Sequence, residues 1–296
     1  MSGSPLPDPL ESGDHEAKGT GNVLRSEGTL QSDTLEQTSA DASDTVTVLV
    51  RRSASGLDQR FTVKRFEQMK VLDLLVAIQR TADSSIAFRY SCRVAMCGTC
   101  ALRVDGHAVL ACQTSVPAGT DPVHLAPLAG FPVLRDLVVD MRPFFERWAH
   151  IVPYVVPFAN ATEPARILPN SPEREVIDPA LDCITCGVCY SSCSVSGNQW
   201  DFLGPAALNR AMVLTADSRD SIGADRLRRI GSADGVDRCH YISACTSYCP
   251  KGLDPFSAIL RLRKWRITGE YPAGAAPSTD SRTDSNAETK SQLGQV

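Results

Sequence analysis

Eleven cysteines in a chain of 296 residues constrain this sequence more than any other feature. They fall into three tight groups, and the most regular group, Cys183–Cys193, has the spacing C-x2-C-x2-C-x3-C. Because eleven is an odd number, a complete set of disulfides would leave one cysteine over. Residues 1–44 lack a basic start followed by an apolar segment, so we expect no secretory leader. Tight cysteine groups in a non-secreted chain favour metal binding over disulfides.

The run Cys183–Cys193 has the ligand spacing of bacterial ferredoxins, in which three thiolates bind one iron–sulfur cubane and the fourth binds a second. A related run, Cys239–Cys249, has the spacing C-x5-C-x3-C and is followed by Pro250. When the two runs are aligned, Ile242 occupies the position of the second cysteine. An isoleucine side chain cannot bind iron, so one of the two clusters is expected to have only three protein ligands.

Ferredoxin-type runs exchange their fourth ligands, and this exchange divides the cysteines between two clusters. We therefore expect one 4Fe–4S cluster with four ligands and one 3Fe–4S cluster with three, where Ile242 stands at the fourth corner. The expected ligands are Cys183, Cys186, Cys189 and Cys249 for the 4Fe–4S cluster, and Cys193, Cys239 and Cys245 for the 3Fe–4S cluster.

Three of the remaining cysteines lie in an earlier loop, Cys92–Cys100, with the spacing C-x4-C-x2-C, and a fourth follows after eleven intervening residues. Plant-type ferredoxins hold a 2Fe–2S cluster with this spacing and a later fourth cysteine. Small loop residues such as Gly98 and Thr99 would let backbone N–H groups approach the sulfurs. Four cysteines could also bind zinc, but zinc sites usually show two separated C-x2-C pairs. The expected 2Fe–2S ligands are Cys92, Cys97, Cys100 and Cys112, and the three sets use all eleven cysteines.

The sequence around this loop predicts a small β-grasp domain. Two segments that alternate apolar and polar residues, Thr45–Val50 and Arg60–Phe66, indicate a β-hairpin. Apolar residues recur at helical spacing in Val71–Ala82, so we expect an amphipathic helix docked on this hairpin. An Asp-Gly pair at 105–106 is a favoured two-residue turn. It predicts a second hairpin that carries the fourth cysteine back to the loop.

The second half of the chain is expected to be helical. Residues 133–150 indicate an amphipathic helical segment that Pro143 kinks or restarts, and residues 151–179 hold six prolines and predict an extended connector. Further helices are expected near residues 205–215, 224–230 and 254–267. The expected fold class is α+β: a plant-type 2Fe–2S β-grasp ferredoxin domain over residues 45–150, an all-α bacterial-ferredoxin-like domain with two clusters over residues 151–271, and disordered tails over residues 1–44 and 272–296.

Composition and charge argue against several classes of function. The net charge of −4 gives no reason to expect nucleic-acid binding, which favours a basic face. Residues 1–44 carry nine acidic residues, unlike an Arg-rich import signal, and such polar tails bury too little apolar surface to fold. The best candidate for a membrane span, residues 151–159, is nine residues long, whereas a span needs ~20. The basic residues of 254–267 fit a solvated helix face or, alternatively, contact with anionic lipid or a partner.

Motifs outside the cysteine spacing support one family resemblance. They are Ser91–Arg93, Phe202–Ala207, Asp217–Asp220 and Cys249–Pro255. With the three cluster motifs in this order and the three-iron variant last, residues 45–270 resemble the iron–sulfur subunit of the succinate dehydrogenase/fumarate reductase family. Ser194 departs from the pattern, because the family usually has proline after the fourth cysteine of the first run.

The resemblance implies an electron-transfer role in an oxidoreductase. Electrons would pass between a separate FAD-containing catalytic subunit and quinone at a membrane anchor subunit, through the 2Fe–2S, 4Fe–4S and 3Fe–4S clusters in order. The family has its quinone pocket near the three-iron cluster, so Ser194, His240 and Ile242 would lie close to quinone. His240 could instead donate to a cluster sulfur. No catalytic acid or base can be assigned on this chain, and we expect a peripheral membrane protein on the cytoplasmic side of a prokaryotic inner membrane.

Two other functions are compatible with the ligand motifs alone. One is a soluble multi-cluster electron carrier, or a wiring subunit for another flavoprotein dehydrogenase. The other is a structural zinc protein. The ligand count of four, four and three, together with the family-like flanking motifs, favours the succinate dehydrogenase/fumarate reductase role.

Overall fold

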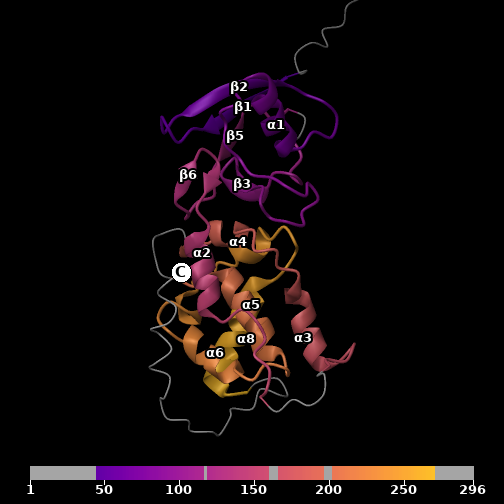
Figure 1. Cartoon of the computed structure of the whole chain (residues 1–296), viewed down its shortest axis with the longest axis vertical. Helices are drawn as coiled ribbons and strands as arrows, with labels where there is room; N and C mark the ends of the chain where they lie inside the picture. The colour runs from indigo at the N-terminus through magenta and orange to yellow at the C-terminus, as the bar shows by residue number, and fades with distance from the viewer. Residues whose placement is uncertain (1–44, 117–118, 160–165, 197–201, 271–296) are drawn as a thin grey trace, which may run out of the picture. The chain divides into compact units, whose positions relative to one another are not determined.

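The computed structural model describes residues 45–116, 119–159, 166–196 and 202–270, and these residues belong to one compact unit. The described strands lie between residues 45 and 139, and every described helix except α1 (Val71–Thr81) follows residue 141 (Figure 1). The two segments expected to be disordered, 1–44 and 272–296, lie outside the described residues. The expected domain boundary at residue 150 stays a prediction.

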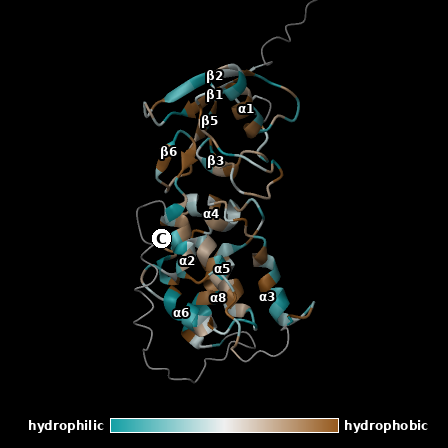
Figure 2. Cartoon of the chain, in the orientation of Figure 1, coloured by the Kyte–Doolittle hydropathy of each residue, from teal (hydrophilic) through white to brown (hydrophobic). Residues whose placement is uncertain are grey.

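A mixed sheet of five strands forms the first part of the fold, in the order β2-β1-β5-β3-β4 (Figure 1). The strands are β1 Thr45–Arg51, β2 Asp58–Lys64, β3 Ala101–Val104, β4 His107–Leu110 and β5 Val123–Ala126. β1 pairs antiparallel with β2 and parallel with β5. The apolar residues of α1 and β1 join one buried core, and Figure 2 shows α1 and β5 as largely apolar. This arrangement confirms the expected β-grasp fold.

The hairpin of β3 and β4 positions the ends of the first cysteine loop. Its turn residues, Asp105 and Gly106, both have positive φ (48° and 87°), as a two-residue type I′ turn requires. The backbone N–H of Ala111 donates to the carbonyl of Cys100 at 3.1 Å, so the ladder continues one step beyond the strands. This pairing brings Cys112 alongside Cys100.

The prediction of a helical segment over residues 133–150 is wrong in its first half. The structure has β6 (Val133–Arg135), β7 (Val138–Val139) and only then α2 (Arg142–His150). Asp136, at the tip of the β6–β7 hairpin, has a buried carboxylate that accepts the backbone N–H groups of Ser53 at 3.1 Å and Ala87 at 3.0 Å. These tertiary contacts override the helical periodicity. Pro143 lies in the first turn of α2, where proline is well tolerated.

The prediction of an extended connector over residues 151–179 is wrong at its end, where α3 (Pro172–Leu181) begins. The Ser171 hydroxyl oxygen accepts the backbone N–H of Arg174 at 3.2 Å, and Pro172 occupies the first helical position. Both are favoured helix starts, because they satisfy or remove backbone donors that have no partner inside the helix. Pro179 also lies inside α3, so the high number of prolines in this segment does not exclude a helix.

The second part of the fold is built around one buried helix, α5 (Pro205–Ala216). Every residue of α5 except Arg210 is buried, and α3, α6 and α8 pack against it. The other helices are α4 Val188–Ser191, α6 Gly223–Ile230, α7 Ala244–Ser247 and α8 Pro255–Thr268, together with a short 3-10 helix at Val236–Arg238. The three helices expected in this region are confirmed. Within the described ranges, no helix combines the length and apolar character needed to cross a membrane.

Several charged residues of the helical part form ion pairs within the chain. Arg226 and Asp220 form a fully buried ion pair at 3.0 Å, and Arg226 also donates to the carbonyl of Ile151 at 3.0 Å. This network ties the segment after α2 to α6. On α8, Arg263 and Arg266 both contact Asp237. Part of the basic charge of α8 is therefore balanced inside the chain.

Candidate iron–sulfur centres

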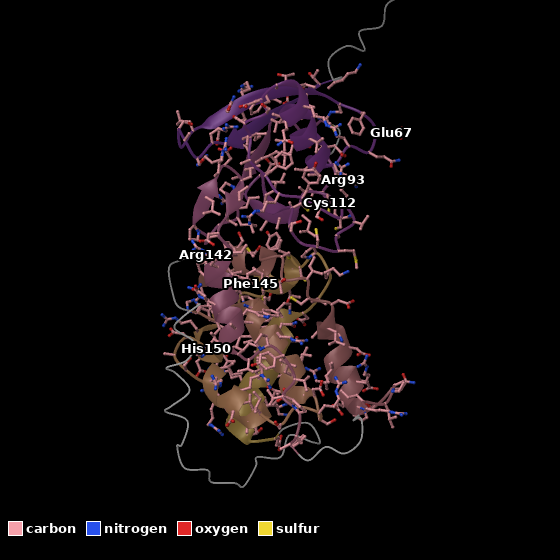
Figure 3. The ribbon with its side chains drawn as sticks, in the orientation of Figure 1. Glu67, Arg93, Cys112, Arg142, Phe145 and His150 are labelled. Atoms are coloured by element: carbon pink, nitrogen blue, oxygen red, sulfur yellow. The ribbon has the colours of Figure 1, made fainter. Side chains whose placement is uncertain are left out.

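The first cysteine loop folds around the sulfur of Cys92. Figure 3 shows Arg93 of this loop and Cys112 as labelled side chains. Arg93 and Ala95 have positive φ (63° and 56°), and this alternation turns successive N–H groups to one side of the loop. The donors to Cys92 Sγ are the backbone N–H groups of Val94, Met96 and Cys97, at 3.4, 3.2 and 3.3 Å. Convergent amide donors stabilise a thiolate, so the loop fits a cysteine that binds iron.

The other three cysteines of this group differ in their surroundings. Burial acts to raise the pKa of Cys97, but hydrogen bonds with the Thr99 hydroxyl, at 2.9 Å, and with backbone groups lower it to about 6. Cys100 and Cys112 are only 4% and 6% exposed, and burial raises the pKa of Cys100 to about 12. The loop thus has a polar side and a buried side, and the buried thiols must release protons when they bind metal.

Gly98 brings the first cysteine loop into contact with the second. Its φ is 71°, and a Cβ atom added there would lie 2.8 Å from the Cβ of Cys186. Real Cβ atoms do not approach so closely, so only glycine allows this contact. A cavity between the two loops is lined by residues of both, including Cys97, Cys100 and Cys186. The expected 2Fe–2S and 4Fe–4S ligand loops are therefore immediate neighbours.

A second cavity lies against α5, and the expected 4Fe–4S ligands surround it. Burial raises the pKa of Cys186 to about 11, so this thiol must also release its proton when it binds metal. Gly187 cannot easily be replaced, because its φ is 79° and an added Cβ would lie 3.0 Å from the ring of Phe131. The cysteines that line this cavity are Cys183, Cys186, Cys189 and Cys249.

A third cavity is lined by the three expected 3Fe–4S ligands and by the three residues expected near quinone. These residues are Cys193, Cys239 and Cys245, and Ser194, His240 and Ile242. Ile242 is 62% exposed and its neighbour Tyr241 is also exposed, so this cavity has an apolar outer rim. Among the described residues, no three Cys, His, Asp or Glu residues are arranged to hold one metal ion.

Two site features were only partly visible in the sequence. Gly98 and Thr99 were expected to act as small residues that let the backbone approach the sulfurs. The structure adds a contact of Gly98 with Cys186 and a hydroxyl–sulfur contact of Thr99 with Cys97. The sequence shows a glycine and a threonine between two ligand cysteines. It does not show which residue each of them contacts in the fold.

Comparisons with known protein domains define the class of protein. Residues 47–146 match the model of a 2Fe–2S iron–sulfur cluster binding domain, and residues 179–253 match that of a 4Fe–4S dicluster domain. These ranges contain all eleven cysteines. Together with the β-grasp sheet and the helical part, the matches make this chain an iron–sulfur electron-transfer protein.

Comparison with whole proteins identifies the family. The chain is 37% identical over 199 residues to "Succinate dehydrogenase [ubiquinone] iron-sulfur subunit 1, mitochondrial" of Oryza sativa subsp. japonica, covering 67% of this chain and 71% of that protein. A chain of the solved "Mycobacterium smegmatis Sdh1 complex in the apo form" has the same fold, with a TM-score of 0.69 and 24% identity over 77% of this chain and 99% of that one. The chain belongs to the family of succinate dehydrogenase iron–sulfur subunits. Its cofactors are the 2Fe–2S, 4Fe–4S and 3Fe–4S clusters of that family.

Proposed function

We propose that this chain relays electrons between an FAD-containing subunit and membrane quinone in a succinate:quinone oxidoreductase. The observation that carries the proposal is the succession of three cysteine-lined cavities along one compact unit. When bound, the clusters accept and release single electrons without a change in the covalent structure of the protein. The proposed ligands are Cys92, Cys97, Cys100 and Cys112 for 2Fe–2S; Cys183, Cys186, Cys189 and Cys249 for 4Fe–4S; and Cys193, Cys239 and Cys245 for 3Fe–4S.

The chain's own residues keep these centres close together. Gly98 lets the first loop touch Cys186 of the second, with no side chain in between. Cys189 lies in α4, and Cys193 follows two residues after this helix ends at Ser191, so only three residues separate these two ligands in the chain. Short separations between successive ligand sets support a relay in which all three centres take part.

The third cavity supports a contact with the quinone end of the complex. Exposed apolar residues such as Tyr241 and Ile242 form its outer rim, and an apolar surface beside a redox centre suits a membrane subunit or quinone. We propose that Ser194, His240 and Ile242 lie near quinone. With a membrane anchor subunit as its partner, the chain would be peripheral, on the cytoplasmic side of a prokaryotic inner membrane.

Purification of the native complex tests this function. We expect the chain to copurify from membranes with a flavoprotein, and succinate to reduce its clusters, as followed by EPR and visible absorbance. Added quinone should then reoxidise them. Isolation of a soluble, fully loaded chain without a flavoprotein would overturn the proposal in favour of an independent electron carrier, and so would a flavoprotein partner that succinate cannot reduce.

A further inference from the structure

We propose that Thr99 helps to set the reduction potential of the 2Fe–2S centre by donating a hydrogen bond to the sulfur of Cys97. This inference rests on the proposed function, because it requires Cys97 to bind iron. The observation that carries it is the distance of 2.9 Å between the Thr99 hydroxyl oxygen and the Cys97 sulfur. The inference adds to the ligand set a residue that touches the centre without binding iron.

The direction of this hydrogen bond follows from the chemistry of the ligand. A free cysteine and a threonine can each act as donor, but a cysteine that binds iron has lost its proton. The hydroxyl of Thr99 then supplies the only proton between the two atoms. Thr99 therefore donates to Cys97 whenever that sulfur is a ligand.

The backbone holds Thr99 in this position. Gly98, between the two residues, is buried against Cys186 and has a positive φ of 71°. Its carbonyl accepts the N–H of Ala101 at 3.3 Å, which closes the turn. Threonine is also restricted at χ1 because it is branched at Cβ. The hydroxyl is thus directed at the sulfur by a fixed turn, although the side chain itself is exposed.

The sign of the effect follows from charge. Adding one electron to the centre increases the negative charge on its sulfur ligands, and no bond is made or broken. A donor stabilises the more negative state more strongly, so it raises the reduction potential. Water competes at the exposed Thr99, so the effect will be smaller than that of a buried donor. The backbone donors to Cys92 do not depend on side-chain identity, whereas this one does.

Potentiometric titration of the complete complex tests the inference. With mediators and dithionite, Thr99→Val should lower the midpoint potential of the 2Fe–2S EPR signal, and Thr99→Ser should keep it near the wild-type value. Thr114→Val is a matched control. Thr114 also stands two residues after an expected ligand, Cys112, but its hydroxyl donates to the carbonyl of Leu110 at 3.0 Å. Its replacement should leave the potential unchanged.

A second measurement keeps the test decisive even where a variant assembles poorly. In deuterated buffer, the reduced wild-type centre should show coupling to an exchangeable deuteron of the Thr99 hydroxyl, and Thr99→Val should lose this coupling. A wild-type spectrum without it, or an unchanged potential in a fully loaded Thr99→Val complex, overturns the inference and leaves the proposed function standing. Equal shifts in Thr99→Val and Thr114→Val overturn it as well. Absence of any 2Fe–2S signal in the wild type would instead overturn the ligand assignment.

Discussion

The two cysteine runs of the helical part follow the same local backbone path with one different ligand position. Cys186 in the first run and Ile242 in the second are each flanked on both sides by residues with positive φ. These are Thr185 (51°) and Gly187 (79°) in the first run, and Tyr241 (62°) and Ser243 (57°) in the second. A helix of four residues then follows in each run, α4 and α7. The local backbone has the same shape in both runs, so it does not explain why the second run lacks a cysteine at this position.

The surroundings of the two positions differ as much as their side chains. Cys186 packs against Gly98 of the first cysteine loop, whereas Ile242 is 62% exposed. The first run therefore turns its second position toward the neighbouring centre of the same chain. The second run turns it outward, where the proposed partner would lie. The same local backbone therefore carries a side chain in internal contact in the first run and an exposed side chain in the second.

The residue after the third position of each run also differs, and it fixes the run to the fold. In the first run this residue is Tyr190, which is buried with its ring centroid 4.9 Å from that of Phe131. In the second run it is Thr246, whose hydroxyl donates to the carboxylate of Asp254 at 2.6 Å. Aromatic packing thus holds the first run, and a charged hydrogen bond at the start of α8 holds the second.

The largest expected effect comes from removing the aromatic ring in the first run. Tyr190→Ala should lower the free energy of unfolding by ~3–5 kcal/mol, the usual cost of deleting a buried aromatic side chain. Because Tyr190 lies between Cys189 and Cys193, both clusters of the helical part should be lost or weakened in EPR, while the 2Fe–2S signal persists. Tyr154→Ala, at an exposed tyrosine, is the control and should change stability by less than ~0.5 kcal/mol. Equal losses in the two variants would contradict the anchoring role of Tyr190.

The sequence predicted the repeated run and the β-grasp fold because both have strong local signals. Cysteine spacing, alternation in the strands and the Asp-Gly turn depend on neighbouring residues. The β6–β7 hairpin could not be predicted in this way, since Asp136 is held by residues 83 and 49 positions earlier in the chain. The contact of Gly98 with Cys186 also joins two residues that are far apart in the sequence. Such partners become visible only when the fold brings the segments together.

A smaller effect is expected at the hydrogen bond that holds the second run. Asp254→Ala removes the N-cap of α8 and the acceptor of Thr246, so stability should fall by ~1 kcal/mol. We expect the three-iron EPR signal to weaken before the four-iron signal on heating. Ser171→Ala, which removes the N-cap of α3, is the matched control: it should cost a similar amount and leave the order of cluster loss unchanged.

The same hydrogen bond predicts a pH dependence. Burial acts to raise the pKa of Asp254, but hydrogen bonds from Ser257 and Thr246 hold it below its ordinary value of 3.8. Since the folded pKa is lowered, the stabilisation is complete above pH 3.8 and is lost as the pH falls through the folded pKa. Asp254→Ala should therefore differ from the wild type in thermal midpoint at pH 6, and less so near pH 3. A constant difference across this range would exclude the carboxylate as the cause.

The smallest change in stability, and the sharpest test of the comparison, is expected at the differing position itself. Ile242→Cys places a thiol on an exposed side chain of a backbone that already matches the four-cysteine run, so stability should change by less than ~0.5 kcal/mol. The cluster should nevertheless gain an iron, and the EPR signal of the oxidised three-iron cluster should disappear. Ile267→Cys, at an exposed isoleucine of α8, supplies the control for an added surface thiol and should keep that signal. If Ile242→Cys retains the three-iron signal with full cluster loading, Ile242 does not stand at the fourth corner, and equal backbone geometry would not imply equal ligand geometry.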